Sequence, residues 1–445
     1  MKKLWFLILL ILIGAGGFVY FSPMFEKIPP TINIETNGYT NLKNPIKVHI
    51  KDSSGIKYID AILIANNQVI ELKKEENPHL GKDIYLNLDL SKYKDLNVKN
   101  IKIKVKAVDN SKWNFLAGNE ASASTTLSVD KTPPYTEIIS NSYAIGKGGS
   151  AAAVVKIEDD NLKDGYILVN NKYKFKLTPF VKNGFYAALI AWPIQEQTFD
   201  AELIAEDLAG NKVIEHIPYY WRNYKYPKAK IKISDRFINE VATRVLRKMD
   251  LSIPSNPVDI FKKVNEEVRS MNEKELYNLT SKVYEDKINS FSIDKFNPLP
   301  GSVEKAPFGE RRTYYYKNEA ISFAIHKGKD LAKYRHARIY ASNFGNVVAS
   351  KYIGIYGNTI VLYHKLGLYS TYSHTFLSKV RPNDRVIKNQ VIALTGSTGA
   401  VFGDHLHFGI YIQGYPVNPT EWMDKYWIKT NIINIINGAK RIINK

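Results

Sequence analysis

The stretch that decides the fold of the last third of the chain reads His405-Leu406-His407-Phe408. Its histidines lie two positions apart, so on a β-strand both imidazoles leave one face, about 7 Å apart along the chain. Leu406 points to the opposite face, and Phe408 continues this alternation toward Ile410. The pattern predicts a strand that offers one histidine to a metal ion and holds the other beside it.

More side chains suited to a metal lie upstream of this strand. His326 and Asp330 flank Gly328, which we expect to let the backbone turn so that both neighbours reach one ion. His374 follows, and six of the nine histidines fall within residues 326–407. Imidazole nitrogens with one carboxylate oxygen are what a catalytic zinc ion takes when one position stays open for water. The sequence therefore predicts a catalytic metal site.

Length and composition bound the rest of the interpretation. The 445 residues are enough for two to four domains. Cysteine is absent, which excludes disulfides, thiolate metal sites and a cysteine nucleophile. The net charge of +19 raises the question of nucleic acid, but the lysines are dispersed and no nucleic-acid motif is present. We expect an anionic cell envelope as the partner instead; a lysine-rich composition with solvated faces is the alternative.

The amino terminus predicts a membrane segment within residues 1–22. Residues 4–21 form an uncharged run of eighteen, which as a helix spans about 27 Å, close to the ~30 Å hydrocarbon core. Lys2 and Lys3 precede the run and favour a cytoplasmic amino terminus with the rest of the chain exported. The apolar run continues past its glycines, which favours an uncleaved anchor over a cleaved signal peptide.

Two similar segments follow, at residues 28–131 and 132–227. Each opens on a diproline, Pro29-Pro30 or Pro133-Pro134, and each later carries an aspartate followed by Gly-Asn. Residues 101–107 alternate between apolar side chains and lysines, as a half-buried strand requires. Short strands between turn residues, at about 100 residues per unit, predict two antiparallel β-sandwiches. Their diprolines and turns resemble those of bacterial immunoglobulin-like domains.

Residues 234–296 predict a helical module. Apolar residues recur at helical spacing after residue 236, and Asn256-Pro257 offers a cap followed by proline at the first helical position. Asn272 with Glu275 predicts a capping-box start for a third helix through Val283. The module is expected to connect the sandwiches to the last third of the chain, and covering the groove there is a further hypothesis.

Strand patterns rich in Tyr, Val and Ile return from about residue 300 and define a last domain at residues 300–424. Residues 425–445 alternate isoleucines with basic residues, which predicts a basic amphipathic tail. Such a helix packs on its own protein more often than on a membrane.

From residue 308 to 422 the chain resembles the lysostaphin/LytM-type zinc endopeptidases, which cleave peptide bonds in bacterial peptidoglycan. The resemblance rests on an ordered set of motifs rather than on a single His-x-His. These motifs are His326-x-x-x-Asp330, Tyr356-Gly357-Asn358-Thr359, Tyr372-Ser373-His374, Gln390-Val391-Ile392-Ala393-Leu394-Thr395-Gly396-Ser397-Thr398-Gly399, His405-Leu406-His407 and Pro416-Val417-Asn418-Pro419.

This resemblance implies roles for five residues. His326, Asp330 and His407 would bind one Zn²⁺ per catalytic domain, and His374 with His405 would form the catalytic pair that handles the water and the oxyanion. The near-neutral pKa of histidine suits that proton transfer.

Two nearby histidines receive no catalytic role: His364 is expected to be a structural strand residue and His336 an exposed loop residue. Asn383 and Asn389 stand where relatives usually have glycine, and asparagine tolerates the positive φ that a tight turn needs.

The predicted fold class is mainly β: an antiparallel LytM-type peptidase domain preceded by two immunoglobulin-like sandwiches and a small helical module. The predicted function is a zinc metalloendopeptidase that hydrolyses peptidoglycan cross-links during cell-wall remodelling. It would be held in the cytoplasmic membrane by a single N-terminal helix, with its catalytic domain facing periplasm or cell wall. An envelope regulatory protein is a further candidate partner, and no nucleic-acid partner is expected.

Two alternatives remain from the sequence. One is a catalytically silent peptidoglycan-binding scaffold, or an activator of other wall hydrolases. The other is a secreted bacteriocin, which the anchor-like amino terminus disfavours.

Overall fold

The structure is a computed structural model that describes residues 2–444, apart from the side chains of residues 2, 78 and 79. It divides into two compact units. The first comprises Met1–Pro134 with Asp159–Asp164 and Glu206–Lys212, and the second comprises Tyr135–Glu158, Gly165–Ala205 and Val213–Lys445.

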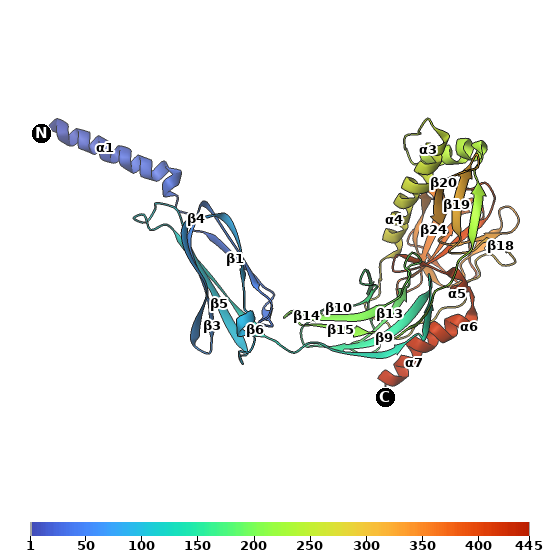
Figure 1. Cartoon of the computed structure of the whole chain (residues 1–445), viewed down its shortest axis with the longest axis horizontal. Helices are drawn as coiled ribbons and strands as arrows, with labels where there is room; N and C mark the ends of the chain where they lie inside the picture. The colour runs from blue at the N-terminus through green and yellow to red at the C-terminus, as the bar shows by residue number, and fades with distance from the viewer. Residues whose placement is uncertain (1, 445) are drawn as a thin grey trace. The chain divides into compact units, whose positions relative to one another are not determined.

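The first unit contains an apolar helix and one antiparallel-rich sheet (Figure 1). Helix α1 spans Lys2–Phe21; within it, residues 3–21 have a mean hydropathy of 2.4 and none of the span is buried, so it is long and apolar enough to cross a membrane. The sheet has the order β1-β3-β5-β6-β2, with β4 paired to β3. Its elements are η1 (Pro23–Phe25), β1 (Thr31–Glu35), β2 (Tyr39–Thr40), β3 (Ile46–Ala65), β4 (Gln68–Leu88), η2 (Ser91–Tyr93), β5 (Asn100–Asp109) and β6 (Glu120–Val129).

Strand β5 confirms the alternation predicted for residues 101–107. Ile101, Ile103, Val105 and Ala107 are all buried, and the residues between them face outward. Period-two burial of this kind places one face of the sheet on a core and leaves the lysine face in solvent.

The two predicted repeats share one hydrogen-bonding pattern. Asn119 donates its backbone N–H and its side-chain amide to the two carboxylate oxygens of Asp109. Asn211 makes the same pair of bonds to Asp207. In each case the asparagine amide also reaches the backbone oxygen of an acidic residue just before the diproline, Glu26 or Asp130. This shared turn supports the predicted tandem repeat, while the immunoglobulin-like assignment stays a prediction.

The second repeat folds into two four-stranded antiparallel sheets with the orders β11-β10-β14-β15 and β12-β13-β9-β7, and a short parallel pair β16-β8. Its most buried strand is β9, which pairs with β13. The bounds are β7 (Tyr135–Asn141), β8 (Ala144–Gly146), β9 (Ser150–Glu158), β10 (Leu162–Val169), β11 (Tyr173–Lys176), β12 (Thr178–Pro179), β13 (Phe185–Ala191), β14 (Ala201–Asp207), β15 (Lys212–His216) and β16 (Tyr220–Arg222).

The last third is built on an eight-stranded antiparallel sheet, in which seven strands have the order β18-β21-β29-β25-β24-β23-β27 and the eighth, β30, pairs with β29. Two three-stranded sheets, β17-β19-β20 and β22-β28-β26, flank it. The bounds are β17 (Lys228–Lys232), β18 (Val303–Ala306), β19 (Arg311–Tyr316), β20 (Glu319–Ile325), β21 (Lys329–Ala332), β22 (Arg338–Tyr340), β23 (Gly345–Ile353), η5 (Gly354–Tyr356), β24 (Gly357–Tyr363), β25 (Leu368–Ser373), β26 (Leu377–Ser378), β27 (Arg385–Val386), β28 (Val391–Leu394), β29 (Leu406–Ile412) and β30 (Tyr415–Val417). The predicted mainly-β fold is thereby confirmed.

The helical residues between β17 and β18 pack directly against this sheet. Figure 1 shows α3 and α4 beside β24 and β20, and one apolar cluster contains side chains of the helices together with those of β23, β24 and β25. The helices are η3 (Phe237–Ala242), α2 (Thr243–Lys248), α3 (Pro257–Lys262), η4 (Lys263–Val268) and α4 (Arg269–Thr280). Asn256 caps α3 through the N–H of Val258 with proline next to it, as predicted.

The predicted third helix start at Asn272 is wrong. Residues 257–280 form one uninterrupted helical run, and Val283 lies beyond its end. Asn272 is buried inside that run, where its Oδ1 accepts the backbone N–H of Ile355 at 2.9 Å. Its side chain serves a tertiary contact between helix and sheet, so it is not available as a cap.

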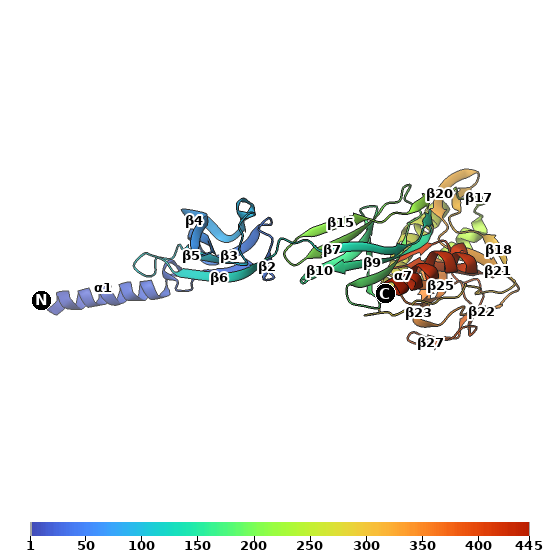
Figure 2. The same cartoon turned by 90° about the horizontal axis from the view of Figure 1, so that it is seen from below.

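The tail packs on its own protein, as expected. After α5 (Pro419–Met423), the tail forms α6 (Lys425–Ile428), η6 (Lys429–Ile433) and α7 (Asn434–Ile443), and α7 lies along β7 and β9 (Figure 2). Ile432, Ile436 and Ile443 are buried, and Lys182 donates to the backbone oxygen of Ile443 at 2.6 Å.

The Asn272 contact gives a stability prediction. Asn272→Ala leaves the buried N–H of Ile355 without its partner, which costs about 1–3 kcal/mol of stability. We therefore expect a lower Tm in thermal unfolding followed by circular dichroism. The matched control is Asn278→Ala on the exposed face of α4, which should change stability by no more than about 0.5 kcal/mol. Equal effects of the two changes would contradict the assigned contact.

Candidate metal centre and active site

Strand register brings two of the predicted ligands together. Asp330 of β21 stands directly opposite His407 of β29, and Ser373 of β25 stands opposite His407 on its other side. The Oδ1 atom of Asp330 lies 2.8 Å from Nδ1 of His407. Leu406 and Phe408 are fully buried on the opposite face, so the alternation predicted for this strand is present and fixes the direction of His407.

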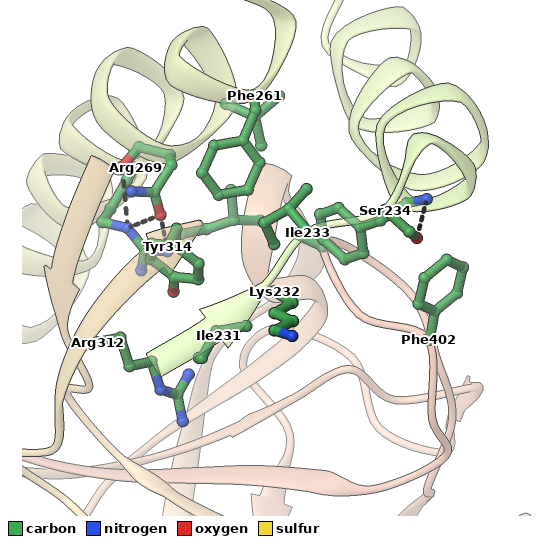
Figure 3. A pocket seen from close by; sticks show the side chains of 14 residues that line it. Ile231, Lys232, Ile233, Ser234, Phe261, Arg269, Arg312, Tyr314 and Phe402 are labelled. Atoms are coloured by element: carbon green, nitrogen blue, oxygen red, sulfur yellow. Dashed lines mark hydrogen bonds between the residues drawn. The ribbon is translucent and has the colours of Figure 1, made fainter. Parts of the chain in front are cut away.

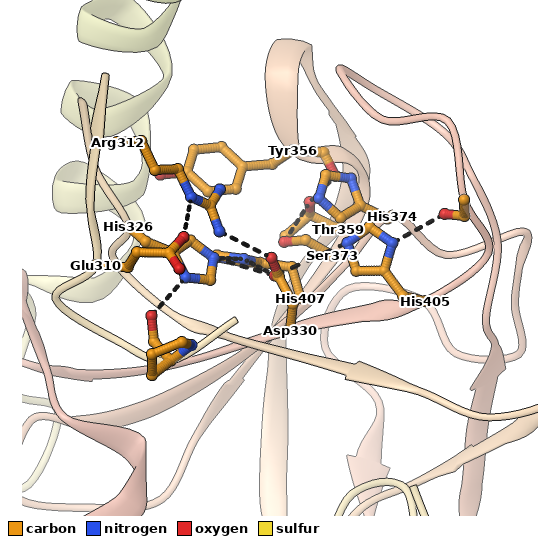
Figure 4. A network of polar contacts seen from close by, with 12 residues as sticks. Glu310, Arg312, His326, Asp330, Tyr356, Thr359, Ser373, His374, His405 and His407 are labelled. Carbon is orange, nitrogen blue, oxygen red and sulfur yellow. Dashed lines mark hydrogen bonds and ion pairs between the residues drawn. The ribbon is translucent and has the colours of Figure 1, made fainter. Parts of the chain in front are cut away.

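His326 completes a cluster of three convergent ligand atoms. It follows the last residue of β20, and its Nε2 lies 3.0 Å from both Oδ1 of Asp330 and Nδ1 of His407. Its Nδ1–H donates to the backbone oxygen of Pro307 at 2.8 Å, which leaves the Nε2 lone pair directed at the cluster. Figure 4 shows the three side chains pointing at one another.

The chemistry of this cluster fits a divalent cation. Burial lowers the pKa of His407 to about 4, so its imidazole is neutral at pH 7. Burial alone would raise the pKa of Asp330, but the contacts with His326 and His407 outweigh it and hold that pKa well below its usual value. Two imidazole nitrogens and one carboxylate oxygen thus present lone pairs to one point, the donor set of a catalytic zinc site.

Gly328 lies at a bend of the backbone and also leaves space for the His407 ring. A Cβ atom at this position would lie 2.4 Å from Nε2 of His407, closer than any side chain tolerates. Its φ is not in the left-handed region, but the backbone bends at this residue and both neighbouring ligands reach one point, as expected. The glycine between the two upstream ligands also lets the His407 ring lie over the backbone.

The two predicted catalytic histidines lie beside the cluster. His374 follows β25 with φ of 62°, and its Nδ1–H donates to the backbone oxygen of Thr398 at 2.8 Å. His405 likewise donates Nδ1–H to the backbone oxygen of Gly403, and its Nε2 lies 3.8 Å from Oδ1 of Asp330. The ring centroids of the two histidines are 4.9 Å apart. Burial, followed by the neighbouring His405 and His407, lowers the pKa of His374 well below its usual value, so His374 is neutral.

Sequence reasoning missed three side chains around the ligands. Arg312 donates Nη2 to Oδ2 of Asp330 at 3.3 Å and Nε to Glu310 at 2.6 Å, and the Tyr356 ring lies 5.5 Å from that of His407. Arg312 reaches the site because the β19–β20 hairpin pairs it with Ala324, close to His326. Only the hairpin register reveals this proximity, and the local sequence around Arg312 carries no such signal.

The remaining nearby residues divide into confirmed and corrected predictions. His364 is buried between the backbone oxygen of Phe344 and the Ser370 hydroxyl, in keeping with a structural role. His336 is half-buried rather than exposed: it contacts the backbone oxygen of Thr395 and its ring packs 4.2 Å from that of Phe376. Asn383 and Asn389 have φ of 74° and 65°, which confirms that asparagine supplies these turns.

Comparisons with known proteins assign this fold to a family of peptidases. Residues 324–419 match the model of Peptidase family M23. Over 95 residues the chain is 38% identical to lipoprotein NlpD of Yersinia enterocolitica, covering 21% of this chain and 97% of that protein. The chain therefore belongs to peptidase family M23, whose members are zinc metallopeptidases.

Two further relatives carry enzyme names. Peptidoglycan DD-endopeptidase ShyA of Vibrio cholerae is 35% identical over 95 residues, which is 21% of this chain and 22% of that protein. DD-carboxypeptidase/endopeptidase Mpg of Neisseria meningitidis is 33% identical over 141 residues, which is 31% of this chain and 30% of that protein. The chain thus spans less than a third of the length of either of these relatives.

The approach of His407 to Gly328 gives a prediction about metal binding. Gly328→Ala should displace the His407 ring and weaken zinc binding by about 10- to 100-fold, the range seen when support around a metal ligand is lost. A competition titration with a chromogenic chelator measures it. The control is Gly438→Ala in α7, where a Cβ meets nothing within 4 Å and zinc affinity should not change. Unchanged affinity in Gly328→Ala would contradict the proposed ligand geometry.

Proposed function

We propose that the protein is a membrane-anchored, zinc-dependent endopeptidase that hydrolyses peptide cross-links of bacterial peptidoglycan. The observation that carries the proposal is the convergence of Nε2 of His326, Oδ1 of Asp330 and Nδ1 of His407 within 3.0 Å of one another, with two further histidines beside them. The peptidoglycan hydrolases among its relatives support the substrate class.

His326, Asp330 and His407 would hold the zinc ion. When bound, zinc supplies Lewis-acid activation of a water molecule and of the scissile carbonyl. The second carboxylate oxygen of Asp330, Oδ2, accepts a hydrogen bond from Arg312, so the guanidinium fixes the orientation of this carboxylate. Burial of the two ligand imidazoles (6% and 5% exposed) keeps competing water from their nitrogens.

The hydrogen bonds of His374 and His405 set the order of proton transfers. In the neutral form each ring has one N–H, and that N–H is committed to a backbone oxygen, of Thr398 or Gly403. Each Nε2 can therefore only accept a proton at first, as a general base does. Once protonated, the same Nε2–H becomes a donor for the developing oxyanion or for the leaving amine.

The N-terminal helix supports the proposed location. Residues 3–21 form an apolar helix of membrane-spanning length, and Lys2 and Lys3 at its start favour an amino terminus in the cytoplasm. The catalytic residues would then work on the outer side of the cytoplasmic membrane, in periplasm or wall. A regulatory protein of the envelope remains a proposed partner.

A silent scaffold or activator of other wall hydrolases is the second candidate, because the relative of which the chain covers 97% carries a lipoprotein name rather than an enzyme name. The complete set of five histidine and aspartate side chains favours catalysis over this candidate.

The test is hydrolysis of purified peptidoglycan by the zinc-loaded full chain in detergent, with released peptides identified by mass spectrometry. We expect peptide release that a chelator abolishes. His374→Ala should still bind zinc yet lose activity by about 10²–10⁴-fold, because it removes one general base. The control His216→Ala replaces an exposed histidine paired with Asp200 and should keep full activity.

Two outcomes would count against catalysis. One is the absence of peptide release from folded, zinc-loaded protein. The other is peptidoglycan binding without turnover together with stimulation of a second hydrolase, which would favour the scaffold or activator.

A further inference from the structure

A cavity of about 290 Å³ lies between the helices and the metal site (Figure 3). Nine of its fourteen lining residues lie between residues 231 and 269, on β17, the loop after it and the helices η3, α3, η4 and α4, and none of these lies in the region that matches the family model. Its volume is at the lower end of the range for small-molecule pockets, about 300–1,000 Å³, so it suits a group of a few atoms rather than a whole cross-link.

The cavity borders the metal site through three of its lining residues. Arg312 contacts Asp330 directly. Ile355 precedes Tyr356, whose ring packs against His407. Ala400 follows Gly399 in the loop that leads to His405, and its N–H bonds the backbone oxygen of Ile355. A peptide held over the ligands can therefore extend into this cavity.

One cation in the wall is held in place by a buried amide. Arg269 donates Nε and Nη2 to the side-chain oxygen of Asn265, at 3.3 and 2.7 Å. Asn265 is only 4% exposed, and its own amide nitrogen is fixed by Ser322 at 2.8 Å. The orientation of the Arg269 guanidinium is thus set by a network that joins the helix to β20. Figure 3 shows Arg269 in the cavity wall.

The charge of Arg269 has no counter-ion in the described part of the chain. Its hydrogen bonds go to a neutral amide and a backbone oxygen, whereas Arg312 is ion-paired to Glu310 and Asp330. Lys232 also lines the cavity, and among its described lining residues none is acidic. Apolar side chains, among them Phe237, Phe261, Val264 and Phe402, make up much of the remaining wall, together with Ser234, Asn265 and Tyr314.

We infer that this cavity is a substrate subsite that binds the terminal carboxylate of a small aliphatic residue of the peptide, with Arg269 as the carboxylate-binding residue. The inference rests on the proposed function for the identity of the peptide. A guanidinium has five N–H donors, and the bonds of Arg269 use only Nε and Nη2, so donors remain for a ligand oxygen. The apolar wall then contacts the methyl or alkyl group beside the carboxylate.

The test measures binding without turnover. The full chain carrying His374→Ala, in detergent, is titrated calorimetrically with a soluble peptidoglycan stem peptide that has a free terminal carboxylate, and with the same peptide amidated at that end. We expect the acid to bind about tenfold or more tightly than the amide, as a charge-assisted hydrogen bond provides. Adding Arg269→Gln should remove this preference, and Arg269→Lys, which keeps the charge, should retain part of it.

The control is Arg247→Gln, an exposed arginine of α2, which should keep the preference. Equal binding of acid and amide by the protein with Arg269 would overturn the inference, as would a preference that survives Arg269→Gln. The titration measures binding and does not depend on hydrolysis. A failure of the proposed hydrolytic function would therefore appear in a different experiment, as an absence of peptide release by the protein that retains His374. In the active chain, Arg269→Gln should raise KM for the acid about tenfold with little change in kcat.

Discussion

The direct pairing of Asp330 with His407 across β21 and β29 is the constraint on which the site depends. A shift of one residue in this register would turn one of the two side chains to the opposite face of the sheet. The buried side chains of Leu406 and Phe408 resist such a shift, because it would expose both of them. The candidate metal site is therefore specified by the same alternation that builds the core beneath it.

Contacts from outside the central sheet hold this geometry. The β19–β20 hairpin places Arg312 on Asp330, and the loop after β28 places the Thr398 oxygen on His374. From the helices, Glu273 pairs with Lys327 beside the first ligand, and Asn272 binds the backbone next to Tyr356. The helices share an apolar core with the sheet, so they contribute to the geometry of the site as well as to its outer wall.

Local sequence patterns predicted a large part of the fold because the structures concerned depend on interactions between neighbouring residues. The alternation in β5, the cap at Asn256 and the positive φ at Asn383 each depend on a few neighbouring residues. The five side chains of the site could also be found by sequence, since an ordered set of motifs surrounds them. Their catalytic and metal-binding roles remain predictions, because the structure shows only that these side chains lie together.

Errors arose where a distant part of the chain decides the role of a residue. Asn272 has the local sequence of a helix cap, but the N–H of Ile355 takes its side chain. The sequence predicted the turn at Gly328 but not that its lack of a side chain also leaves space for the His407 ring. His336 is half-buried because Thr395 and Phe376 lie against it. Each of these partners lies more than fifteen residues away in the sequence, so no local pattern predicts the contact.

The most direct test of the proposed metal centre is an anomalous difference map at the zinc edge from crystals of the zinc-loaded protein. We expect one strong peak about 2.0–2.2 Å from Nε2 of His326, Nδ1 of His407 and an oxygen of Asp330, with His374 and His405 outside the ligand set. A peak bound by His374 or His405 in place of these ligands, or no peak between the three, would contradict it.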